Sequence, residues 1–165
     1  GDKCVIGYEA NGGFLTGNDI QLDGCNGVLT ALPTRDAVLP ILAALLNARK
    51  KQQTLSESVA ELPPRFTGSG IIREFPTETG QSIVKSFVEN GETQVNELLS
   101  ETFGPCKTLD FTDGARITFE SGSIIHFRPS GNAPEFRVYT EADSEADALK
   151  NNEVGVNLIK EKFAK

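Results

Sequence analysis

The residues best suited to chemistry in this sequence surround a Ser-Gly-Asn turn, within the stretch HFRPSGNAPEFRVYTEA. Arg128 precedes the turn and offers a planar donor fork to an anion, while the Ser130 hydroxyl and the Asn132 amide add further donors. Gly131 permits a positive φ, so successive N–H groups of the loop are able to face one concavity. This pattern predicts a local anion site, with Arg137 on the following strand as a secondary candidate.

The overall charge limits what such a site would hold. A formal net charge of −7 argues against nucleic acid as a partner, because binding to a phosphate backbone depends on surplus Lys and Arg. Three or four charge-assisted hydrogen bonds, each contributing about 1.5–3 kcal/mol, would suffice to hold one phosphate without a basic surface. The alternative interpretation is a plain strand connection whose Arg128 pairs with a neighbouring carboxylate. The residues alone leave both interpretations open.

The elements that position this turn are predicted from apolar patterns between residues 64 and 165. The order is β-α-β-β-β-α, an α+β domain with an antiparallel sheet and helices on one face. Asp113-Gly114 and Ser121-Gly122 are hairpin signals between alternating runs. The phosphate turn joins the last two strands.

The preceding segment is predicted to form a separate unit. A short β-branched run at Val5 and Ile6 is followed by a Gly-rich loop, a pattern typical of a strand that ends at a ligand. A helix is expected over residues 35–50 with Thr34 as N-cap, and a second short helix ends at Pro63-Pro64. We therefore predict domains at residues 1–62 and 63–165.

The segment RPSGNAPEFRVYTEADSEADA resembles the carboxy-terminal signature of the α-D-phosphohexomutases, R-P-S-G-T-E-P followed by a strand and an acidic helix start. The lead-in DGARITFESGSIIHF is also similar to that family. The resemblance implies a TBP-like fourth domain with about four strands and two helices, preceded by the end of an α/β third domain. It also implies that phosphate is bound by Arg128, Ser130, Gly131, Asn132 and Arg137. Asn132 and Ala133 depart from the usual Thr and Glu.

A second loop, GYEANGGF, is similar to the sugar-binding motif G-E-x-S-G-H of the same family. The resemblance implies that Glu9 and Asn11 bind the sugar hydroxyls, while Gly13 replaces the motif's His. A carboxylate flanked by glycines accepts hydrogen bonds from vicinal hydroxyls while the backbone approaches closely. The alternative is that Glu9 is a solvated loop carboxylate.

The activity that the resemblance implies is interconversion of hexose 6-phosphate and hexose 1-phosphate through a phosphoserine and a bisphosphate intermediate. Mannose is the favoured sugar, and glucose and glucosamine phosphates remain alternatives. We find no phosphoserine loop, no D-G-D-G-D metal loop and no methionine in the sequence, and therefore expect a carboxy-terminal fragment that is inactive alone. The catalytic residues and the ligands of Mg²⁺ would then lie in amino-terminal domains of the same protein.

The absence of a long apolar run or a secretory signal predicts a cytoplasmic protein without a membrane partner. The three cysteines have neither zinc-site nor disulfide spacing and are expected to be reduced thiols. A free-standing, non-catalytic phosphosugar-binding module is the functional alternative from another class.

Overall fold

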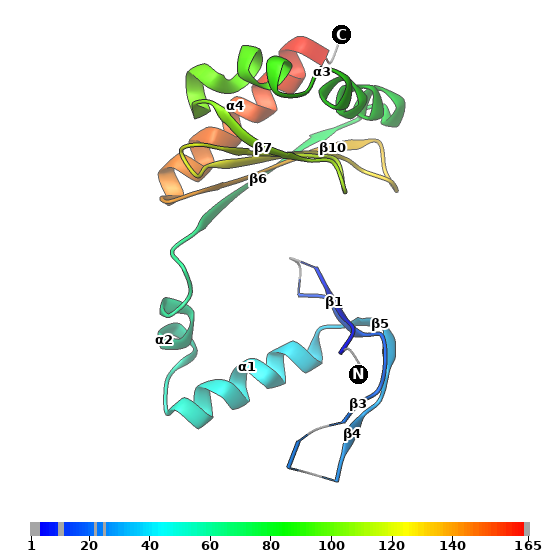
Figure 1. Ribbon diagram of the computed structural model, residues 1–165, viewed down its shortest axis with the longest axis vertical. Coiled ribbons are helices and arrows are strands. Elements are labelled where there is room, and N and C mark those ends of the chain that lie inside the picture. Colours follow the sequence, from blue (N-terminus) through cyan, green and yellow to red (C-terminus); the bar gives the residue numbers. More distant parts are fainter. Residues whose placement is uncertain (1–3, 10–11, 22, 25, 164–165) are drawn as a thin grey trace. The chain divides into compact units, whose positions relative to one another are not determined.

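A computed structural model of the chain describes residues 4–9, 12–21, 23–24 and 26–163. The chain divides into two compact units, Gly1–Pro63 and Pro64–Lys165 (Figure 1). Among the described helices, none is both long and apolar enough to span a membrane.

The first unit contains short strands followed by two helices. Its elements are β1 (Ile6–Tyr8), β2 (Phe14–Thr16), β3 (Ile20–Gln21), β4 (Val28–Leu29), β5 (Leu32–Asp36), α1 (Val38–Lys51) and α2 (Leu55–Ala60). β1, β2 and β5 form an antiparallel sheet in that order, and β3 pairs with β4. The assignment of this unit to an α/β sugar-binding domain stays a prediction.

Helix α1 begins later than the sequence pattern indicated. Thr34 belongs to β5 and is not the N-cap, which is Ala37. The Asp36 side chain accepts a hydrogen bond from the Val38 N–H at 2.7 Å and so satisfies one donor that the helix start leaves unpaired. Pairing of β5 with β2 explains the shift, because it holds the residues before Ala37 in extended backbone.

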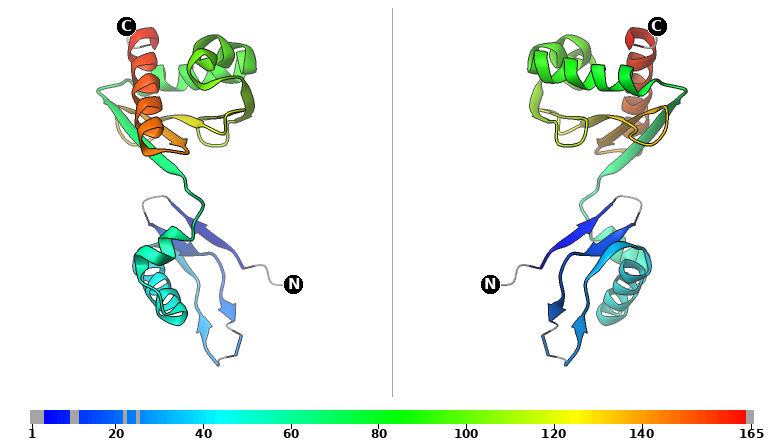
Figure 2. Two further views of the ribbon diagram at one scale, coloured as in Figure 1. Left: turned by 90° about the vertical axis from the view of Figure 1, so that its left-hand side faces the viewer. Right: turned by 90° about the vertical axis from the view of Figure 1, so that its right-hand side faces the viewer.

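The second unit is an α+β domain, as predicted. Its elements are β6 (Phe66–Arg73), α3 (Thr77–Phe103), β7 (Cys106–Asp110), β8 (Ala115–Phe119), β9 (Ile124–Pro129), β10 (Glu135–Ala142) and α4 (Glu145–Phe163). The sheet is antiparallel in the order β6-β10-β9-β8-β7, and both helices cover the same face of it (Figures 1 and 2). The sheet has five strands, whereas the resemblance implied about four. The edge strand β7 contains a register shift, which weakens its alternating pattern.

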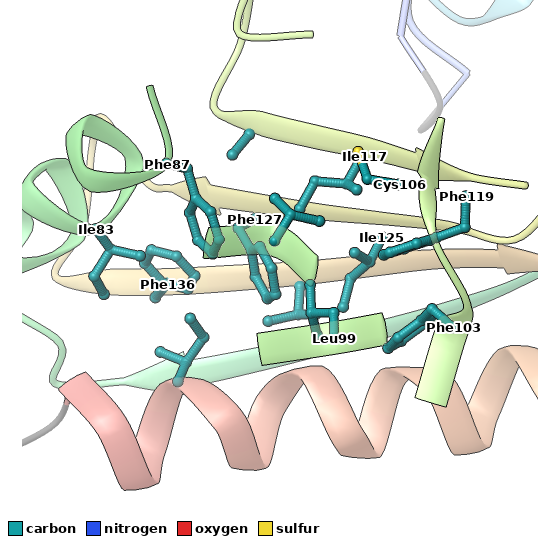
Figure 3. Close-up of a cluster of buried hydrophobic side chains, with 14 of the residues drawn as sticks. Ile83, Phe87, Leu99, Phe103, Cys106, Ile117, Phe119, Ile125, Phe127 and Phe136 are labelled. Carbon is teal, nitrogen blue, oxygen red and sulfur yellow. The ribbon is translucent and has the colours of Figure 1, made fainter. Parts of the chain in front are cut away.

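The core of this unit lies between the sheet and its helices. Phe87 of α3 stacks on Phe127 of β9 with ring centroids 5.5 Å apart, and Phe103 stacks on Phe119 at 4.8 Å (Figure 3). These four rings are almost fully buried. Aromatic packing of this kind contributes about 0.5–1.5 kcal/mol per pair beyond the area buried, so the core fixes β8 and β9 firmly against α3.

The opposite side of this sheet carries the alternate side chains and is called here the open face, since neither helix of the unit covers it. It is formed by the half-buried positions of β8, β9 and β10, namely Arg116, Thr118, Ile124, His126, Arg128, Glu135, Arg137, Tyr139 and Glu141. The two-residue period of a strand places these side chains, all but Ile124 polar or charged, on one face while their neighbours fill the core. The predicted phosphate-binding arginines both lie on this face.

Candidate functional site

Arg128 and Arg137 are direct cross-strand partners in the β9–β10 pair. Their side chains are 39% and 34% exposed, so both guanidinium groups stand half-buried on the open face. Two like charges directly opposite each other destabilise a sheet unless counter-charges are near. The arrangement therefore requires negative groups near the two arginines.

Each of these arginines has one carboxylate neighbour in the structure. Asp113 Oδ2 lies 2.8 Å from Arg128 Nε, and Glu135 Oε2 lies 3.4 Å from Arg137 Nη2. The Nε–H of Arg128 does not point straight at this oxygen, and the contact is a close ion pair. The Asp113 carboxylate raises the pKa of Arg128. Both guanidinium groups consequently remain fully charged.

Tyr139 lies two residues after Arg137 on the same face and acts on both arginines. The Tyr139 hydroxyl is the largest cause of the raised pKa of Arg137, and Glu135 is the next. Tyr139 also contributes to the raised pKa of Arg128. Sequence reasoning missed Tyr139, although its spacing from Arg137 predicts a shared face. It also assigned Asp113 only a turn role, because the sequence does not show which strand the turn approaches.

The carboxylate partner required by the alternative interpretation is thus present. The Arg128–Asp113 pair forms at Nε, on one edge of the guanidinium, whereas the donor fork for phosphate includes the terminal nitrogens. The pair and an anion site are therefore compatible. The assignment of Arg128 and Arg137 to phosphate stays a prediction.

The loop beside these arginines covers residues 130–134, because β9 continues through Pro129, which pairs with Phe136, and β10 begins at Glu135. Its first N–H, that of Ser130, donates to the Glu135 carbonyl at 2.8 Å and is committed to the chain itself. The Pro134 carbonyl accepts from the Phe75 N–H at 2.9 Å, which anchors the loop to the start of α3. The loop is held at both ends.

The tip of the loop is accessible. Gly131 and Asn132 are exposed, and a Cβ on Gly131 would meet no heavy atom within 4 Å. Gly131 does not have a positive φ, so this glycine leaves space without a left-handed bend. Ser130 is 8% exposed, and its Oγ lies 3.4 Å from the Asn132 N–H. Open space at the tip would admit a ligand close to the backbone.

The predicted sugar loop lies between β1 and β2 in the first unit. The Glu9 N–H donates to the Gly13 carbonyl at 2.9 Å, and the Gly12 N–H donates to the Glu9 carbonyl at 3.0 Å. Glu9 Oε2 is 2.8 Å from Arg35 Nη2, and both side chains are exposed. Asn11 lies outside the described residues. A sugar-binding role for Glu9 and Asn11 remains a prediction.

Other chemistry is not evident in the part of the chain that the structure describes. It contains no group of three or more His, Cys, Asp and Glu side chains arranged to hold a metal ion. His126, the one histidine of the sequence, places Nε2 within hydrogen-bond distance of the Asp113 carbonyl. This histidine supports the turn before β8.

Comparison with known proteins points to the same family that the sequence motifs resemble. Residues 83–154 match the C-terminal domain of phosphoglucomutase/phosphomannomutase. Phosphomannomutase from Salmonella muenchen is 41% identical over 99% of this chain and 33% of its own length. Phosphomannomutase from Sinorhizobium fredii is 43% identical over 87% of this chain and 29% of its own length. Phosphoglucosamine mutase from Methanocaldococcus jannaschii is 30% identical over 97% of this chain and 30% of its own length.

A solved structure supports the fold. The open form of the Paramecium phosphoglucomutase parafusin superposes with a TM-score of 0.51 at 17% identity, covering 84% of this chain and 30% of that one. The chain spans about a third of the length of the curated relatives that it matches. It belongs to the phosphoglucomutase/phosphomannomutase family, and its second unit contains the family's C-terminal domain.

Proposed function

We propose that this chain is the carboxy-terminal part of a phosphohexomutase that interconverts hexose 6-phosphate and hexose 1-phosphate, with mannose as its sugar. The proposed route uses a phosphoserine, Mg²⁺ and a bisphosphate intermediate, all supplied with their ligands by other domains of the same protein. The chain contributes the binding loops and is not expected to turn over substrate by itself. The likeness to two phosphomannomutases supports mannose, and that to a phosphoglucosamine mutase keeps glucosamine as an outcome of the test.

The observation that supports this proposal best is the paired position of Arg128 and Arg137 beside the exposed tip of the Ser130 loop. Two adjacent guanidinium groups match the oxygens of a phosphate, and their charges would be compensated by its two negative charges. A bisphosphate that turns around must present either phosphate to one site. Fixed donors around a symmetric anion meet that requirement.

The test is a titration of the chain with mannose 6-phosphate, mannose 1-phosphate and the corresponding glucose and glucosamine phosphates, followed by NMR. We expect saturable shifts at Gly131 and Asn132, which are lost in Arg128→Ala. Arg65→Ala is the matched control, because it removes the same charge as Arg128→Ala. Arg65 pairs with Asp143 next to the start of β6, whereas the end of β6 at Arg73 pairs with Glu135 beside the loop. In the intact protein, Arg128→Ala should lower turnover strongly without loss of fold.

Two results would contradict the proposal. If none of the sugar phosphates shifts the loop signals, the loop is not a phosphate site. If Arg128→Ala and Arg65→Ala reduce binding equally, the effect comes from overall charge and not from a built site. Preference for glucosamine phosphate over mannose phosphate would correct the substrate alone.

A further inference from the structure

The turn between β7 and β8 lies directly against β9 at Arg128. Gly114 has φ +93°, and a Cβ at this position would stand 2.4 Å from the Phe127 carbonyl oxygen and 3.2 Å from Arg128 Cα. Contact this close between two backbones is possible only with glycine. The fold thereby brings the residue before Gly114, which is Asp113, to the side of Arg128.

The backbone of Asp113 is held in addition by a side chain of β9. The His126 ring places Nε2 within hydrogen-bond distance of the Asp113 carbonyl oxygen. His126 and Arg128 are two residues apart on one strand and share the open face. The turn is therefore attached to β9 at Asp113 by the ring contact and at the next residue by the close approach of Gly114.

The Asp113 carboxylate meets the guanidinium of Arg128 at Nε, with 2.8 Å between the two atoms. A free arginine side chain has about 2 kcal/mol of rotamer entropy, and part of this is lost when the side chain is ordered for binding. A carboxylate at Nε orders the guanidinium in advance while the terminal nitrogens keep their donors. Glu135 stands in a looser relation to Arg137, at 3.4 Å from Nη2.

We propose that Asp113 is a positioning residue that holds the Arg128 fork in the orientation needed to bind a substrate phosphate. This inference rests on the proposed function, because it takes Arg128 as a phosphate ligand. Asp113 itself does not touch the phosphate. Its carboxylate acts through Arg128, and the glycine after it makes the required approach of the turn possible.

The Asp113–Arg128 pair permits a second role for Asp113, with the opposite effect on phosphate affinity. If Asp113 competed with phosphate for Arg128, removal of its carboxylate would free the guanidinium and tighten phosphate binding. If Asp113 orients Arg128, its removal weakens binding, although one negative charge near the anion is lost. The contact at Nε favours orientation, and the direction of the affinity change distinguishes the two roles.

The experiment compares Asp113→Ala and Asp113→Asn with the unchanged 165-residue chain, using inorganic phosphate and mannose 6-phosphate as probes. Glu89→Gln on α3 is the matched control, since it removes one negative charge that pairs with Lys85 away from the open face. The Arg128 Nε–H resonance, identified by its loss in Arg128→Lys, reports the order of the guanidinium directly. Circular dichroism checks that each variant is folded.

We expect Asp113→Ala to weaken the binding of both probes by about three- to tenfold, which is the range for ordering one long side chain on binding. Asp113→Asn keeps a side-chain oxygen near Nε and should lie between the unchanged chain and the alanine variant. The Arg128 Nε–H signal should move and exchange faster in the alanine variant, even without ligand. A purely structural role of Asp113 would lower stability without this ordered series.

Equal or tighter binding by Asp113→Ala, with binding still lost in Arg128→Ala, would overturn the positioning role and leave the proposed function standing. Unchanged binding in Arg128→Ala would overturn both. If Asp113→Ala unfolds, Asp113→Asn decides: an Nε–H signal and affinity unchanged from those of Glu89→Gln would refute the dependence on the carboxylate.

Discussion

The two hairpin glycines of the second unit offer a sharp test of the packing around the site. Gly114 and Gly122 are each the second residue of a hairpin signal, and both have positive φ, +93° and +83°. A Cβ on Gly122 would meet no heavy atom within 4 Å, whereas a Cβ on Gly114 would press on the Phe127 carbonyl. The same substitution by alanine therefore separates conformational strain from steric conflict.

The magnitudes follow from these surroundings. Gly122→Ala should lower the free energy of unfolding by about 1–2 kcal/mol, the cost of a left-handed conformation for a residue with Cβ. Gly114→Ala carries the same cost plus about 1–3 kcal/mol of overpacking, because the atom that it meets is backbone and cannot rotate away. A difference of about 2 kcal/mol corresponds to a Tm lower by about 8–16 °C for a domain of this size.

The assay is urea and thermal unfolding of both variants, followed by circular dichroism. Gly114→Ala should also weaken the contact between Asp113 and Arg128, since the turn has to move away from β9. Equal losses of stability in the two variants would show that the turn before β8 does not rest on β9. That result would refute the packing on which the positioning role of Asp113 depends.

Two further predictions concern titrating groups. Burial raises the pKa of the Cys106 thiol, so at pH 8 iodoacetamide should modify Cys106 more slowly than the exposed Cys4, with peptide mass spectrometry as the measurement and equal rates as the contrary result. The Thr112 N–H donates to Asp110 and lowers the pKa of this carboxyl, so its stabilisation is present at neutral pH and is lost as the pH falls below about 4. In Asp110→Asn the urea midpoint should fall less between about pH 5 and pH 3 than in the unchanged chain, and parallel curves would exclude this contribution.

The sequence was sufficient for the class of fold and for the place of the candidate site. Alternating apolar residues and two Gly-containing turns predicted the antiparallel sheet, since strand period and turn chemistry are local properties. The Arg-Pro-Ser-Gly-Asn motif located the loop between the last two strands. Helix α3 has a kink at Gly91, where the Asn-Gly dipeptide is itself a local turn signal.

Local patterns failed where distant segments compete for a residue. Thr34 has the chemistry of an N-cap, yet pairing of β5 with β2 keeps it in a strand. Gly131 permits a left-handed bend, but its φ is not positive and the loop does not use this freedom. At Thr34 a contact between segments outweighed the preference of a single residue.

What the sequence by itself determined is which residues are chemically able to bind a phosphate and which residues of one strand share a face, because side chains alternate with a period of two. Only the tertiary structure decided that Arg137 lies opposite Arg128 and that Asp113 reaches Nε from another hairpin. The physical reason is that register and close approach arise from packing between segments, such as Gly114 against β9, and no local pattern encodes them.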